Sequence, residues 1–209
     1  VEITFETIKP LNKSVNEMFL ADNGTEFLKM AFEESLFPVA FLAKKKYFGV
    51  PHISEPNFDT KVPLFIRGLE MKKRGVSDML IDVCMSILKN AVSHQNILTI
   101  MEIVQSKIIE VYGKDWSGPE DFQAFVMTGV YKPSKQNVKM HTFHDRMIQE
   151  QNIAIKAGER INYVITKKYP YKFDSRGRKS ALSIGDKMEL VEIAQKNNMV
   201  IDLDYYMEK

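Results

Sequence analysis

Three consecutive lysines and a tyrosine, residues 44–47, follow directly on the apolar run "PVAFLA". In an extended strand successive side chains point to opposite faces, so Lys44 and Lys46 would share one face with Lys45 on the other. Two ammonium groups on one face repel each other unless an anion neutralises them. A nucleic-acid phosphate backbone is such an anion, and it gains affinity by releasing counterions. Tyr47 adds a flat ring and a hydroxyl donor, so this cluster favours phosphate contact over a merely solvated face.

A second cluster places four cations within eight residues, in the stretch "RGLEMKKRG". It lies between a glycine and the expected start of a helix, where free backbone amides add positive potential. This cluster is therefore a second candidate for phosphate contact, and its members are Arg67, Lys72, Lys73 and Arg74.

A third group of cations is spread over a polar stretch that includes "FDSRGRKS". Its charge is sufficient for a phosphate contact, but a solvated loop is the simpler interpretation. The group consists of Lys167, Lys168, Lys172, Arg176, Arg178 and Lys179.

Catalytic and metal-binding patterns are weaker. His141 and His144 lie three residues apart with Asp145 adjacent, a spacing that can bind a metal on a helix, but no further ligand set is evident. An enzyme built around these three residues remains an alternative. The adjacent Glu33 and Glu34 would point to opposite faces of a strand and cannot act as an acid–base pair. The sequence contains no phosphate-binding loop, dinucleotide-binding glycine pattern or nucleophile elbow.

Composition limits the classes of protein that the chain can represent. The 209 residues carry a net charge of only +2, so binding to a polyanion must come from clustered cations. The single cysteine, Cys84, excludes an internal disulfide and a cysteine-rich zinc site, and it fits a reducing compartment. No apolar run approaches the roughly 18 residues of a transmembrane helix, and no signal peptide is visible. The first residue, Val1, and an ending typical of a starting helix suggest cuts in a longer polypeptide.

The first part of the chain is predicted to be rich in strands. Alternation over residues 1–8 favours a strand, and residues 13–21 favour a short helix closed by the turn signal "DNG". The stretches "FLKMAFEE" and "FPVAFLAKKKYFG" are interpreted as the two strands of a hairpin. The nearly all-apolar residues 38–43 predict a strand buried on both faces.

The rest of the chain has mainly helical periodicity. A helix with Ser77 as its N-cap is followed by a second that stops at Gly113, a third that begins at Pro119 and a fourth around residues 140–147. "RINYVITKK" predicts a strand and "GDKMELVEIAQKNN" a fifth helix. We place the boundary between the two parts near residue 67. The fold class is therefore α+β.

Four segments in order resemble family B DNA polymerases. "LKMAFEESLFPVAFLAKKKYFG" is similar to the end of the family's palm domain, where a lysine-rich, tyrosine-containing motif precedes glycine. "RGLEMKKRG" follows at the family's spacing. "AGERINYVI" and "KNNMVIDLDYYMEK" resemble a strand and a late segment of the thumb domain. The double tyrosine alone is a weak signal, but the ordered set is specific and covers most of residues 27–209. The stretch from about residue 95 to residue 130 matches nothing in the pattern.

The resemblance implies an architecture and a set of contacts. Residues 1–66 would be the C-terminal part of the palm, with strands, a short helix and the lysine–tyrosine hairpin. Residues 67–209 would be a mainly helical thumb with a small strand element near residues 160–175. Contacts near the primer end would come from Lys44, Lys45, Lys46 and Tyr47, and the DNA backbone at the hinge would be held by Arg67, Lys73 and Arg74. The sequence departs from the family at Gly75, where an acid, amide or serine is common, and at Phe48, where smaller apolar residues are common.

The resemblance also implies an activity that this segment would not perform alone. The parent protein would be a DNA-directed DNA polymerase, a nucleotidyltransferase. Segments rich in asparagine and lysine, together with a divergent thumb, suggest a viral one. In the family, nucleotidyl transfer with Mg²⁺ needs two metal-binding aspartates, one of them in an aspartate-threonine-aspartate turn, and no such turn is present in this sequence. We therefore expect no catalytic or metal-binding residue in this segment.

The expected partners follow from the same resemblance. They are the primer–template duplex, the remaining palm, the fingers and the exonuclease domain, with a processivity factor as a further candidate and no membrane. The site of action would be intracellular, where DNA is replicated, in the host nucleus or cytoplasm for a virus. A helical protein–protein interaction module that does not bind nucleic acid is the alternative.

Overall fold

The computed structural model describes residues 1–57, 62–94, 96–116, 118–133, 137–169, 171–173 and 176–208. The chain divides into two compact units. The first comprises Val1–Leu69 and Leu88–Ile100, and the second Glu70–Ile87 and Met101–Lys209. Helices and small antiparallel sheets occur together in the chain, which confirms the α+β class.

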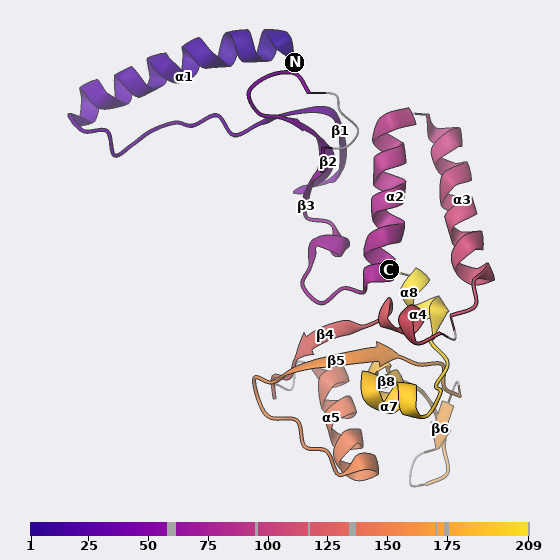
Figure 1. Ribbon diagram of the computed structural model, residues 1–209. Helices are drawn as coiled ribbons and strands as arrows, with labels where there is room; N and C mark the ends of the chain where they lie inside the picture. Colours follow the sequence, from indigo (N-terminus) through magenta and orange to yellow (C-terminus); the bar gives the residue numbers. More distant parts are fainter. Residues whose placement is uncertain are drawn as a thin grey trace. The chain divides into compact units, whose positions relative to one another are not determined.

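The first unit contains a long helix and a three-stranded antiparallel sheet (Figure 1). The sheet has the order β1-β2-β3, and the end of helix α2 and the start of helix α3 also belong to this unit. The bounds are α1 (Glu2–Asn23), β1 (Ser35–Ala43), β2 (Lys46–His52), β3 (Phe65–Arg67), α2 (Asp78–His94) and α3 (Ile97–Gly113).

The strand predicted for residues 1–8 is wrong, because these residues begin the 22-residue helix α1. Phe5 is buried, and the partly buried Ile8, Val15 and Phe19 follow it at helical spacing along the same helix. The alternation of the first eight residues is therefore a short sample of a 3.6-residue period. The expected end is confirmed, since α1 stops at Asn23 and Gly24 caps it in the left-handed conformation.

The predicted hairpin is shifted along the chain. Residues 27–34 form no strand; instead the side chain of Asn16 on α1 donates to the carbonyl of Met30 at 2.9 Å and accepts from its amide at 2.7 Å. These bonds satisfy the backbone that a strand partner would otherwise satisfy. The run "FPVAFLAKKKYFG" was predicted as one strand but contributes to both strands of the hairpin, β1 and β2. Residues 38–43 are also not buried on both faces, since Phe41 is 75% exposed in this chain.

The second unit is built on the antiparallel sheet β4-β5-β8, with α5 and α7 beside it (Figure 1). Its core includes the fully buried side chains of Phe125, Phe143, Met147, Val164 and Tyr206. Its remaining elements are η1 (Glu70–Lys72), α4 (Pro119–Gln123), β4 (Met127–Val130), α5 (Val138–Gln151), β5 (Arg160–Ile165), β6 (Tyr171–Phe173), β7 (Lys179–Ala181), α6 (Ile184–Lys187), β8 (Met188–Leu190), α7 (Val191–Lys196) and α8 (Leu203–Met207).

Most of the predicted elements of the later part are confirmed, with two corrections. The fifth helix is interrupted, because Met188–Leu190 pairs with β5 as strand β8. Ser77 does precede α2, and its carbonyl accepts the amide of Ile81 at 3.2 Å. Its hydroxyl, however, makes no hydrogen bond within the described residues, so it does not cap the helix through its side chain. Across the described ranges, no helix combines the length and apolar character needed to cross a bilayer.

Candidate nucleic-acid interface

The lysine cluster forms the turn between β1 and β2. Lys44 and Lys45 make the turn, with Lys45 in the left-handed region at φ 61°, and Lys46 begins β2. The predicted alternation of Lys44 and Lys46 on one strand face is therefore wrong, because the chain reverses direction between them. All three side chains are exposed, and among the described residues no carboxylate forms an ion pair with any of them. The turn thus presents three positive charges to solvent with no carboxylate partner in the described part of the chain.

Tyr47 and Arg67 lie directly opposite each other on the paired strands β2 and β3. Directly opposed residues share a face of the sheet. On this face Tyr47 stacks on Phe65 with ring centroids 5.9 Å apart, and Phe41 lies on its other side at 5.7 Å. Three rings therefore share this face of the sheet with the side chain of Arg67. Neither phenylalanine was predicted from the sequence as a site residue. Phe65 lies two residues before Arg67 on the same strand, so strand alternation places it on the same face.

Gly68 positions the segment after β3 against the basic turn. Its φ is 74°, and a Cβ atom at this position would lie 2.1 Å from the carbonyl oxygen of Lys45. Only glycine fits such a close approach of two backbones. The structure therefore brings the turn lysines, Tyr47 and Arg67 together within the first unit.

The cations at positions 72–74 lie in the second unit, at the end of η1 and just after it. All three are exposed, and Lys73 pairs with Glu70. Gly75, where the sequence departs from the family pattern, has a φ of 82°, and its carbonyl accepts the amide of Thr128 at 3.2 Å. A Cβ atom on Gly75 would lie 2.1 Å from the Thr128 carbonyl oxygen, which explains the glycine.

The third cluster has a different role in the structure. Lys168 lies 3.4 Å from Glu189, and Lys172 lies 2.9 Å from Asp186. Glu189 is only 2% exposed, and Arg146 also contacts it at 3.1 Å. Lys168 and Lys172 are thus held by carboxylates of the second unit. The Arg146–Glu189 pair was not predicted from the sequence.

The ion pair between Lys172 and Asp186 is supported by further hydrogen bonds to the carboxylate. Burial alone would raise the pKa of the Asp186 carboxyl group, but hydrogen bonds from Lys172 and Ser183 outweigh burial and lower it below the ordinary value. Ser183 also accepts the backbone amide of Asp186, which completes a capping box at the start of α6. The ion pair therefore belongs to the architecture of the second unit.

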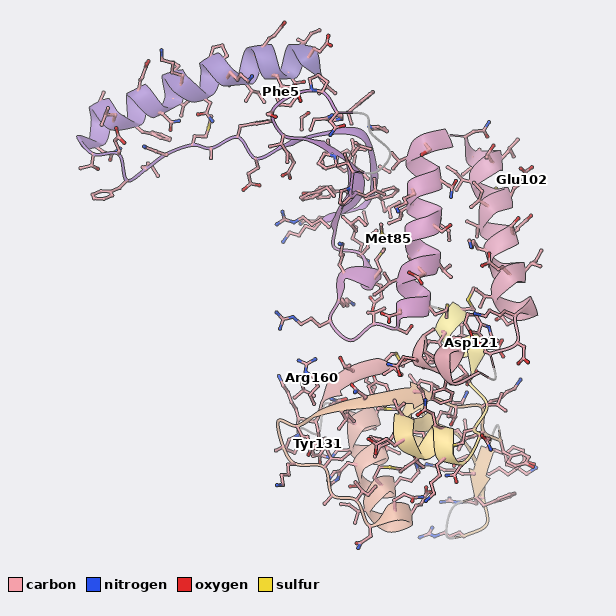
Figure 2. All side chains as sticks on the ribbon, viewed as in Figure 1. Phe5, Met85, Glu102, Asp121, Tyr131 and Arg160 are labelled. Atoms are coloured by element: carbon pink, nitrogen blue, oxygen red, sulfur yellow. The ribbon has the colours of Figure 1, made fainter. Side chains whose placement is uncertain are left out.

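The histidine pair on α5 packs against an aromatic ring. The His144 ring stacks on Tyr131 with centroids 4.5 Å apart, and His141 meets the same ring edge-on. Figure 2 labels Tyr131 in this region. In the part of the chain that the structure describes, no three histidine, cysteine, aspartate or glutamate side chains gather as a metal site. The described residues thus do not fit a two-metal centre.

Comparison with protein families matches residues 1–209 to DNA polymerase family B. The chain belongs to this family. This match confirms the resemblance to family B that the sequence indicated. The mixture of helices and antiparallel sheets confirms the α+β class.

Individual family B relatives come from viruses and cellular organisms. The chain is 34% identical over 226 residues to DNA polymerase beta of African swine fever virus (isolate Tick/Malawi/Lil 20-1/1983), covering 99% of this chain and 18% of that protein. It is 25% identical to the DNA polymerase delta catalytic subunit of Dictyostelium discoideum, covering 87% of this chain and 15% of the other. The chain thus spans about a fifth or less of the length of these relatives.

A solved structure shares the fold. The family B DNA polymerase of the hyperthermophilic archaeon Pyrobaculum calidifontis superposes with a TM-score of 0.55 over 94% of this chain and 23% of that one. The sequence identity is 14%, so this similarity concerns the fold alone.

Proposed function

We propose that this chain is part of a DNA-directed DNA polymerase and grips the primer–template duplex through contacts to the DNA backbone. Membership of family B supports the activity. The observation that carries the grip is the turn at residues 44–46, whose three exposed ammonium groups have no carboxylate partner among the described residues. A phosphate backbone supplies the missing negative charge and releases counterions when it binds.

The division of labour follows the family pattern. Residues 1–66 would end the palm, and residues 67–209 would form the thumb. Lys44, Lys45, Lys46, Tyr47 and Arg67 would contact the duplex from the first unit. Lys72, Lys73 and Arg74 would contact it from the second unit.

The chemistry of nucleotidyl transfer would be carried out elsewhere in the protein. Mg²⁺ would be held by aspartates outside this segment, and the segment alone would be inactive. Its partners would be the remaining palm, the fingers, the exonuclease domain and a processivity factor. The protein would act at intracellular sites of DNA replication, and the viral relatives at 34% identity favour a viral origin.

The contacts should be independent of DNA sequence, because phosphates position a protein on DNA without carrying sequence information. Ammonium groups on a turn reach phosphates as point charges on flexible stems. Each phosphate that is neutralised should add about 0.9 to the slope of log affinity against log salt concentration.

The test uses the full-length protein and two duplexes of unrelated sequence. Lys46→Ala should weaken binding to both duplexes by the same factor and should shorten processive synthesis. Lys196→Ala is a matched control, since Lys196 is an exposed lysine on α7 that lies outside the proposed contacts. A loss confined to one duplex, or an equal loss in the control, would contradict backbone contact.

A helical interaction module is the second candidate, and exposed apolar side chains on α3 favour it. Ile109 is 72% exposed and Ile108 is 40% exposed. Retention of the protein on duplex DNA at low salt, with steep release as salt rises, would separate the two functions. An interaction module would show neither.

A further inference from the structure

The second unit contains a cavity of about 310 Å³ between the segment before α2 and the start of α5. Gly75 and Ser77 line it from the first of these segments, Asn137 and Lys139 from the second, and Thr128 from strand β4. All of these residues belong to one compact unit, so the cavity is a property of that unit. None of the lining residues from α5 or β4 was selected from the sequence.

The charge around this cavity is positive. Glu70 and Lys73 both line it and pair with each other. The other charged residues in the described lining are Arg74 and Lys139. Both side chains are exposed, and neither has a carboxylate partner among the described residues. Asp78, the acidic residue in the first turn of α2, is exposed and lies outside the lining.

Two helices of 17 and 14 residues begin at the cavity, α2 and α5. The start of each helix carries the positive end of its dipole. Part of each first turn is already bonded, since the amide of Met79 donates to Ala124 at 2.9 Å and that of Met140 donates to Asn137 at 3.1 Å. Asn137, which precedes α5, makes no side-chain cap bond. The cavity therefore combines two helix starts with two cationic side chains.

Ser77 provides an independent indication of a ligand. It is 1% exposed and lines the cavity, yet its hydroxyl has no hydrogen-bond partner within the described residues. Buried polar groups in native proteins nearly always have a partner, and an unsatisfied one requires an explanation. The nearby Thr128 hydroxyl is already engaged, since it accepts from Arg160 Nη1 at 3.3 Å. Figure 2 shows Arg160 on β5, beside β4.

We propose that this cavity binds one phosphodiester group of the DNA backbone. Lys139 and Arg74 neutralise the phosphate, and the Ser77 hydroxyl donates to one of its oxygens. The positive dipole ends of α2 and α5 add to this favourable potential. The inference rests on the proposed function, and it adds a contact from the second unit that is distinct from the turn at residues 44–46.

Salt-dependent binding of a DNA duplex to the full-length protein tests the proposal. Lys139→Ala should lower the salt slope by about 0.9, and Lys139→Arg should restore it. Ser77→Ala should weaken binding about 2- to 10-fold without changing the slope, because a hydroxyl carries no charge. Lys132→Ala is the control, since Lys132 is an exposed lysine of the same unit outside the cavity lining.

The outcomes separate this proposal from the proposed function. If Lys46→Ala lowers the slope while Lys139→Ala and Ser77→Ala change nothing, the cavity does not bind backbone phosphate and the grip at the turn stands. If the unsubstituted protein shows no salt-dependent binding, both proposals fail. If Lys139→Ala weakens competition by inorganic phosphate but leaves duplex binding unchanged, the cavity binds the free anion and the proposal is overturned.

Discussion

Basic side chains have opposite environments in the two three-stranded sheets of this family B chain. At the sheet β1-β2-β3, the turn lysines are exposed and have no carboxylate partner among the described residues. At the sheet β4-β5-β8, Arg146 and Lys168 contact the buried Glu189. Whether a cation is paired therefore matters more than whether it belongs to a cluster. A paired cation stabilises the fold, whereas an unpaired one is available to bind a ligand.

We call the ion-paired residues at the sheet β4-β5-β8 the paired side and the turn lysines at the sheet β1-β2-β3 the unpaired side. Stability should be more sensitive to substitution on the paired side. Removing one member of a buried ion pair leaves the other charge without compensation, which costs far more than losing a solvated surface charge. The unpaired side should tolerate removal of a lysine with little loss of stability. Its losses should appear in DNA binding instead.

The largest expected effect is that of Glu189→Ala. It removes the carboxylate that Arg146, which is 11% exposed, shares with Lys168. Arg146 keeps its contact to Glu150 at 2.7 Å, but Lys168 loses its carboxylate partner among the described residues. We expect the free energy of unfolding to fall by about 3–5 kcal/mol, measured by denaturant titration. The matched control is Glu192→Ala, an exposed glutamate on α7, which should change stability by less than about 0.5 kcal/mol. Equally small losses of stability in the two variants would show that the contacts of Glu189 do not stabilise the fold.

The next effect concerns the unpaired side. Gly68→Ala adds a Cβ atom that would lie 2.1 Å from the Lys45 carbonyl oxygen, at a φ of 74°. A side chain in the left-handed region costs on the order of 1–3 kcal/mol, and the clash adds to this cost. Gly24→Ala is the control, because φ is 64° there and no atom lies within 4 Å of the added carbon.

Gly68→Ala should therefore destabilise the protein more than Gly24→Ala, and it should also weaken DNA binding because the turn is displaced. Denaturant titration and duplex binding of the two variants measure the difference. Equal loss in both variants would mean that backbone conformation alone matters at Gly68.

The smallest effect is a change in pH dependence at Asp186. Its pKa is lowered in the folded protein, so its contribution to stability is present above the ordinary value of 3.8 and is lost as pH falls through the lower folded value. Asp186→Asn should therefore reduce stability at neutral pH and flatten the loss of stability in that acidic range. Unfolding free energies measured from pH 2 to pH 7 test this. An unchanged acid limb would assign the acid sensitivity to other groups.

The helical part of the fold was largely predictable from the sequence. Helices α2, α3 and α5 and strand β5 follow the apolar periods of 3.6 and 2 that the sequence displays. The start of α1 was mispredicted because eight residues are too few to separate the two periods. Strand β8 was missed because its identity depends on pairing with β5, which lies more than twenty residues earlier in the chain.

The candidate site was predictable only in part. Sequence clustering found the turn lysines, and the pairing of β2 with β3 then placed Arg67 beside Tyr47. Clustering could not reveal that Lys168 and Lys172 are held by Glu189 and Asp186, because both carboxylates come from later elements. It also could not bring Lys139 near Arg74, since the two residues meet only through the packing of the second unit.

That unpaired cations bind DNA and paired cations stabilise the fold is tested most directly by comparing Lys46→Ala with Lys168→Ala in the full-length protein. For each variant the slope of log DNA affinity against log salt concentration is measured together with the free energy of unfolding. Pairing predicts that Lys46→Ala lowers the slope by about 0.9 at unchanged stability, whereas Lys168→Ala lowers stability and leaves the slope unchanged. An equal loss of slope in both variants, or a loss of slope in Lys168→Ala alone, would contradict this division between paired and unpaired cations.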